Sequence, residues 1–114
     1  MKLSEAIRLG SMLKPQGFGH DSARMNAKAT CAFGAVQDAL GRIVIPVLHW
    51  PWLTQGNACP ACGELDRTLS VISVHLNDAH RWSRERIADW VATIEPSESP
   101  EVPEEKVLEA EAAR

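Results

Sequence analysis

Residues 59–82 read CPACGELDRTLSVISVHLNDAHRW, and this stretch decides how the chain folds. Two residues separate Cys59 from Cys62, twelve more precede His75, and four separate His75 from His80. Zinc prefers four thiolate or imidazole ligands in a tetrahedron, and this C-x2-C-x12-H-x4-H pattern has the spacing of such sites. The alternative is a pair of buried cysteines and two unrelated histidines. Because the spacing favours the first interpretation, we predict one Zn2+ ion bound by Cys59, Cys62, His75 and His80.

Four protein ligands leave no coordination position for a water molecule, so the predicted zinc is structural rather than catalytic. Two catalytic patterns are also missing from the sequence. A zinc deaminase requires H-x-E before its P-C-x-x-C, whereas His49 is followed by Trp50 and Pro51. A zincin requires H-E-x-x-H, which the segment from His75 to His80 lacks. We therefore expect that the protein is not an enzyme and that its zinc has no catalytic role.

The composition is that of a small globular domain followed by an acidic segment. Of the 114 residues, 45% are hydrophobic and 24% are charged, close to ordinary globular usage. Residues 1–94 hold 10 Lys and Arg against 8 Asp and Glu, and residues 95–114 hold 2 against 7. No stretch has the roughly 20 apolar residues of a membrane-spanning helix. The opening MKLSEAIRLG carries charges where a secretory signal is apolar, so we expect a cytoplasmic protein.

Hydrophobic spacing and turn signals predict a mainly α domain of about four helices over residues 1–94. The helices are expected over residues 4–14, 22–40 and 66–78 and from Ser83 to 94, with Ser4, Asp66 and Ser83 as N-caps. The segment IVIPVLHWPWL at 43–53 contains two prolines and is expected to be extended over the core. Residues 95–114 are rich in proline and glutamate, which predicts a disordered, flexible tail.

The ligand spacing resembles that of a C2H2 zinc finger, over about 22 residues. In that family three helix positions contact bases, and they correspond here to Thr68, Val71 and Val74. Two valines cannot make the paired hydrogen bonds that distinguish bases. Ile72 matches the buried leucine of the family, and Asp66 stands where the family has an aromatic residue. We therefore expect this helix face to pack against the rest of the domain.

A second resemblance covers most of residues 1–94. The segments TCAFGAVQDALG at 30–41 and HLNDAHRWSRERIADWV at 75–91 resemble a group of small, functionally uncharacterised phage and bacterial proteins. Those proteins carry a C-A-x-G-A helix and an L-N-D-x-H-x-W-S-R-E segment. The resemblance implies a phage or prophage origin, and it supplies no activity.

A cluster of arginines at the start of the fourth helix is a candidate nucleic-acid contact. Arg81, Arg84 and Arg86 lie there beside Trp82. With the preceding helix they could form a helix-turn-helix whose arginines contact phosphates. The alternative, which we favour, is a solvated basic face, because arginines near a helix start are common.

Two further features are candidates for function. Trp50 and Trp52 are expected to cover the core, and they would indicate a partner surface only if they were exposed. Cys31 could be a nucleophile with His20 or His49 as its base. A buried core cysteine is the favoured interpretation, because free cysteine is among the most buried residue types.

Together these observations predict a small zinc-stabilised accessory protein, phage- or prophage-derived, that acts by binding another protein. The alternative is a DNA-binding regulator that uses the basic start of the fourth helix. An enzyme centred on Cys31 is the least favoured interpretation. The sequence leaves the partner and the oligomeric state open.

Overall fold

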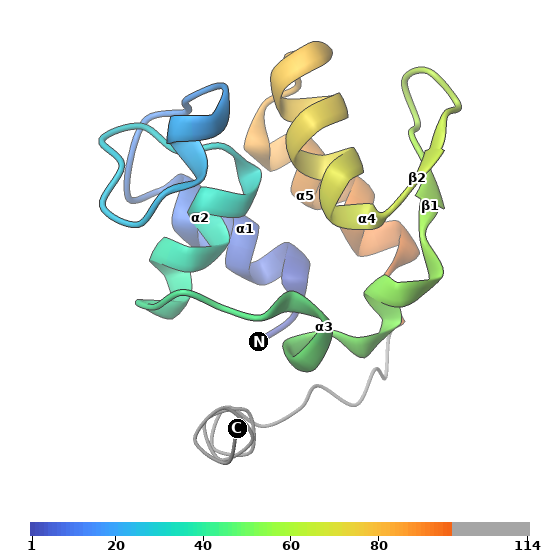
Figure 1. Cartoon of the computed structure of the whole chain (residues 1–114), viewed down its shortest axis with the longest axis horizontal. Coiled ribbons are helices and arrows are strands. Elements are labelled where there is room, and N and C mark those ends of the chain that lie inside the picture. The colour runs from blue at the N-terminus through green and yellow to red at the C-terminus, as the bar shows by residue number, and fades with distance from the viewer. Residues whose placement is uncertain (97–114) are drawn as a thin grey trace.

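The structure, a computed structural model, describes residues 1–96, and helices make up most of it (Figure 1). The α-helices are α1 (Leu3–Ser11), α2 (Ala32–Leu40), α3 (Pro46–His49), α4 (Thr68–Ser70) and α5 (Arg84–Ile94). The remaining elements are the 3-10 helices η1 (His20–Ala23) and η2 (Pro51–Gln55), the π-helix η3 (Val71–Ala79), and the antiparallel strands β1 (Asn57–Ala58) and β2 (Leu65–Asp66). The predicted mainly α class is confirmed. No helix within residues 1–96 is both long and apolar enough to cross a bilayer.

Helix α1 packs against both α2 and α5. Its buried positions recur at helical spacing, with Leu3, Ile7 and Gly10 on the inner face. At Gly10 an added Cβ would lie only 1.9 Å from the carbonyl oxygen of Ala35, so α1 and α2 approach more closely than any side chain would allow. Helices α2, η3 and α5 add Ala32, Val36, Val71, Ile72, Leu76, Ile87, Ala88 and Val91 to the same core.

Arg84, the first residue of α5, lies inside the domain with 4% of its surface exposed. Its guanidinium donates to the Thr30 hydroxyl at 2.7 Å and to the carbonyl oxygens of Ser11 and Lys14 at 3.2 and 2.6 Å. Burial lowers the pKa of the Arg84 guanidinium, although arginine remains charged at physiological pH. The Ser11 carbonyl is at the C-terminal end of α1, where a positive charge is favourable, and Lys14 lies three residues beyond that end. Arg84 therefore joins α5, α1 and the segment before α2.

The ends of α1 and α5 also meet. The predicted cap Ser4 lies within the first turn of α1, since the helix begins at Leu3. Its backbone amide and its hydroxyl both donate to the carboxylate of Glu95, which satisfies an unpaired donor of that turn. The predicted cap Ser83 is confirmed, because its hydroxyl accepts from the amide of Arg86 at 3.1 Å. Residues 97–114 of the predicted flexible tail lie outside the described residues.

The predicted start of the second helix was wrong. Residues 20–23 form the separate 3-10 helix η1, and α2 begins only at Ala32. The backbone of Thr30 explains the interruption, because its amide donates to Pro15 and its carbonyl accepts from Gly17, both at 2.9 Å. Those backbone groups are therefore not available to an α-helix. Gly41 ends α2 in the left-handed conformation, as predicted.

The prediction of an extended segment at 43–53 was wrong. Pro46 begins α3 and Pro51 begins η2. A proline at the first position of a helix lacks only an amide that would have no partner there, and its fixed φ suits the helix. The two prolines therefore start short helices, which carry Trp50 and Leu53 into the core.

We predict that Arg84→Ala lowers the free energy of unfolding by about 2–4 kcal/mol, since one buried and two partly buried acceptors lose a charged donor. Arg86→Ala is the matched control two residues later. Its side chain is exposed over the Trp82 ring, and its loss is expected to cost below about 1 kcal/mol. Chemical denaturation of both variants measures the difference. Equal effects would contradict a structural role for Arg84.

Candidate metal centre

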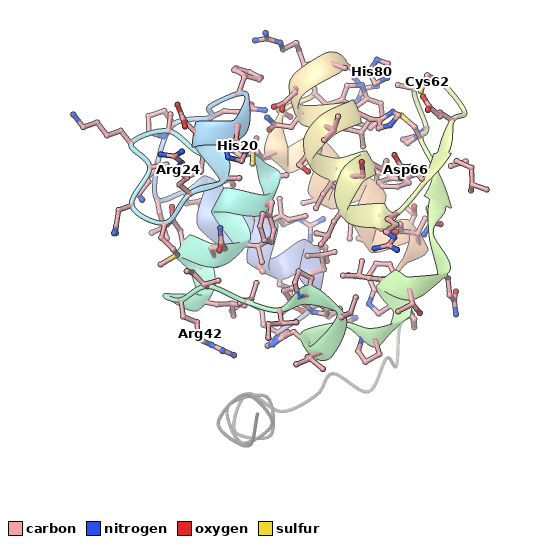
Figure 2. All side chains as sticks on the ribbon, viewed as in Figure 1. His20, Arg24, Arg42, Cys62, Asp66 and His80 are labelled. Atoms are coloured by element: carbon pink, nitrogen blue, oxygen red, sulfur yellow. The ribbon has the colours of Figure 1, made fainter. Side chains whose placement is uncertain are left out.

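The four predicted ligands come together at one end of the molecule. The ligand atoms of Cys59, Cys62, His75 and His80 all lie within 4.8 Å of one another. Figure 2 shows Cys62 at the tip of the hairpin and His80 at the end of the neighbouring helix. Residues far apart along the chain are thus close enough to bind a single metal ion.

The β1–β2 hairpin positions the two cysteines. Ala58 pairs with Leu65, and Cys59 donates its amide to the carbonyl oxygen of Glu64 at 2.8 Å. The carbonyl of Cys59 accepts from the amide of Gly63 at 2.7 Å, which closes the turn around Cys62. Gly63 has a φ of +78°, a conformation that glycine adopts readily. This tight turn brings both sulfurs to the same side.

The π-helix η3 brings the two histidines together. His80 donates its backbone amide to the carbonyl oxygen of His75 at 2.7 Å, a bond between residues five apart. An α-helix would instead place Ala79 over that carbonyl. The wider turn therefore places His80 above His75, and their ring centroids are 6.4 Å apart. Arg81 follows with a φ of +58°, which ends the helix.

The third predicted helix differs at its start. Asp66 is the last residue of β2, and the helix begins at Thr68 with Arg67 as its N-cap. The Asp66 carboxylate accepts from the amide of Arg67 at 2.7 Å. The predicted N-cap role of Asp66 is therefore wrong, although its carboxylate accepts a hydrogen bond from the amide of Arg67, the actual N-cap.

One distance in the cluster can be compared with metal geometry. The Sγ of Cys62 is 3.6 Å from Nδ1 of His75. Zinc–sulfur and zinc–nitrogen bonds of ordinary length, at the tetrahedral angle, separate the two ligand atoms by about 3.5 Å. The pair therefore has the spacing that one shared tetrahedral ion requires.

Asp66 is a site residue that the sequence analysis did not identify as one. Its Oδ2 lies 3.5 Å from Nε2 of His75, on the other side of the ring from Cys62. Hydrogen bonds from the Arg67 amide and the Ser70 hydroxyl, together with His75, hold the pKa of the Asp66 carboxyl below its usual range. One signal for this role is present in the sequence, which has an acidic residue where zinc fingers have an aromatic one.

The candidate arginines separate into two groups. Arg84 is buried and bound to Thr30 and α1, so its guanidinium is not on the surface. Arg81 and Arg86 are exposed, and their guanidinium carbons lie 4.0 and 3.7 Å from the ring centroids of Phe18 and Trp82. Only these two of the three could contact a phosphate.

The tryptophans do not form an exposed surface. Trp50 is 2% exposed, and its indole Nε1 donates to the carbonyl oxygen of Met1 at 3.0 Å. Trp52 is half-buried and packs against the core. Both therefore cover the core, which was the favoured interpretation of the sequence.

Cys31 is the N-cap of α2 rather than a mid-helix residue, and it is 2% exposed. Its Sγ accepts from the amide of Gly34 at 3.4 Å. Cys31 and His20 line the same pocket, whose volume is about 290 Å³. The ring of His49, the other suggested base, lies instead 4.4 Å from that of Trp50.

No protein-family model, curated protein or solved structure matches the chain. The zinc-finger resemblance can still be compared with the geometry of the helix. Thr68 and Val71 are fully buried, as expected of a face packed on the domain, whereas Val74 is 56% exposed. Two of the three positions that would contact bases are thus inside the protein.

We predict that the purified chain binds one divalent metal ion and that Cys62→Ser abolishes tight binding, because one thiolate ligand is lost. Cys31→Ser is the matched control, since Cys31 lies outside the cluster and serine is a good N-cap. Native mass spectrometry of both variants counts bound ions. Loss of the ion in Cys31→Ser but not in Cys62→Ser would contradict the assignment.

Proposed function

We propose that the chain is a small zinc-stabilised interaction protein that acts by binding another protein. The observation that carries the proposal is the cluster of two cysteines and two histidines with ligand atoms within 4.8 Å. Thiolate and imidazole together suit zinc, and hard cations such as magnesium and calcium prefer oxygen ligands. Four such ligands complete a tetrahedron, so the metal is proposed to stabilise the fold rather than to activate water.

The proposed zinc would join two elements that otherwise have few connections. The hairpin β1–β2 is only two residues long on each strand, and an isolated short hairpin is marginal in water. Zinc would join its turn to the C-terminal end of η3 through His75 and His80. Metal binding would then contribute directly to the folding free energy of this region.

Helix η3 also forms one wall of a pocket. The pocket lies between η1 and η3, and Figure 2 shows His20 and Cys62 on opposite sides of the η3 helix. Gly19 donates its amide to the Asp78 carboxylate at 3.1 Å, which joins the two walls. The pocket is lined by Gly19, His20, Ala23, Cys31, Ser73, Val74 and Asp78. Its volume of about 290 Å³ could accommodate one side chain of a protein partner.

Val74 is the residue that we propose contacts the partner. It lines the pocket and is 56% exposed. Its apolar side chain could therefore contact a side chain of a partner that enters the pocket. The arginine surface is a weaker basis for a DNA-binding function, because Arg84 is buried and both Arg81 and Arg86 stack on aromatic rings. A phage or prophage origin and a cytoplasmic location remain part of the proposal on the basis of sequence alone.

Partner capture with matched variants tests this function. Immobilised zinc-loaded protein is compared with Val74→Glu and with Leu65→Glu, an exposed apolar residue of β2 that does not line the pocket. We expect Val74→Glu to lose a protein partner that Leu65→Glu and the unchanged chain retain at moderate salt. Retention of nucleic acid alone, lost in Arg81→Ala plus Arg86→Ala and steeply dependent on salt, would favour the DNA-binding regulator instead.

A further inference from the structure

We infer that Asp66 is a positioning residue for the metal, which accepts a hydrogen bond from Nε2–H of His75 and so fixes Nδ1 as the nitrogen that binds zinc. The inference rests on the proposed zinc site and adds a fifth residue to it. Asp66 is a carboxylate that does not bind the metal itself.

The two nitrogens of His75 face different partners. Nδ1 is 3.6 Å from the Sγ of Cys62, inside the cluster of ligand atoms. Nε2 is 3.5 Å from Oδ2 of Asp66, on the outer side. The ring is therefore oriented with one nitrogen toward the metal position and the other toward a carboxylate.

The chemistry of imidazole then assigns the proton. A histidine that binds a metal is neutral, so one nitrogen has a free lone pair and the other carries the hydrogen. If Nδ1 binds the metal, the hydrogen is on Nε2, where Asp66 is the acceptor. The reverse tautomer would place a lone pair against a carboxylate, and the two would repel.

Asp66 is itself held in place for this contact. Its Oδ1 accepts from the amide of Arg67 at 2.7 Å, and its backbone pairs with Asn57 across the hairpin. These contacts leave Oδ2 directed at His75.

Such a carboxylate has a known physical effect on a histidine ligand. It fixes the tautomer and the orientation of the ring and makes the ligand nitrogen more basic. Removing a partner of this kind typically weakens metal binding by about 10–100-fold. The thiolates and His80 would remain, so binding would be weakened and not abolished.

The test is zinc affinity measured by competition with a chromophoric chelator. We expect Asp66→Ala to bind Zn2+ about 10–100-fold more weakly than the unchanged chain. Asp66→Asn retains a neutral acceptor, so its zinc affinity is expected to lie between those of Asp66→Ala and the unchanged chain. Glu64→Gln is the matched control, because it removes an exposed carboxylate of the same hairpin that lies outside the cluster. Equal losses in Glu64→Gln and Asp66→Ala would overturn the inference, because the effect would then be one of net charge.

A second readout separates positioning from a loss of stability. Nitrogen-15 spectra of the zinc-loaded chain are expected to show His75 bound through Nδ1 with Nε2 protonated. Binding of zinc through Nε2 of His75 would overturn the role of Asp66 and leave the zinc site intact. If the unchanged chain does not bind zinc at all, the proposed function itself fails, and the two failures are thus distinguishable.

Discussion

The hydrogen bond from the amide of His80 to the carbonyl of His75 is the constraint on which the candidate metal centre depends. It spans five residues and belongs to the π-helix η3. π-helical turns are uncommon and are frequently found at functional sites. In η3 the wider turn places two histidines beside the hairpin cysteines, while Ile72 and Leu76 still face the core. The same helix presents Val74 to the pocket. One local distortion thus accompanies both the packing of the helix on the core and the placement of the candidate ligands.

The candidate metal ligands could be predicted from the sequence because their identity and spacing limit the choices. Cys59, Cys62, His75 and His80 form the cluster that the pattern indicated. The last helix and its cap Ser83 could be predicted for a similar reason, since a capping side chain and apolar spacing are local signals. The π-helical turn could not be predicted, because it depends on how η3 packs against the rest of the domain. The contact of Asp66 with His75 could not be predicted either, since it joins a strand to a helix.

Charge and aromatic content were the least informative signals. Arg84 and Arg86 are two residues apart in the sequence, yet one is buried among carbonyls and the other lies exposed over Trp82. From the sequence, Trp50 could have been part of a partner surface. It is instead buried, and its indole donates to the carbonyl oxygen of Met1. Such residues differ through tertiary contacts, which composition does not encode. Long-range pairing also explains the late start of α2, because Thr30 pairs with residues 15–17.

X-ray absorption spectroscopy of the purified, zinc-loaded chain tests the central claim most directly, which is that a closed set of two thiolates and two imidazoles holds one zinc ion. The predicted spectrum contains two sulfur neighbours at about 2.3 Å and two nitrogen neighbours at about 2.0–2.1 Å. Two imidazole rings would also contribute outer-shell scattering. A spectrum with a single sulfur, or with oxygen neighbours in place of nitrogen, would contradict a closed Cys2His2 site and reopen the metal to other roles.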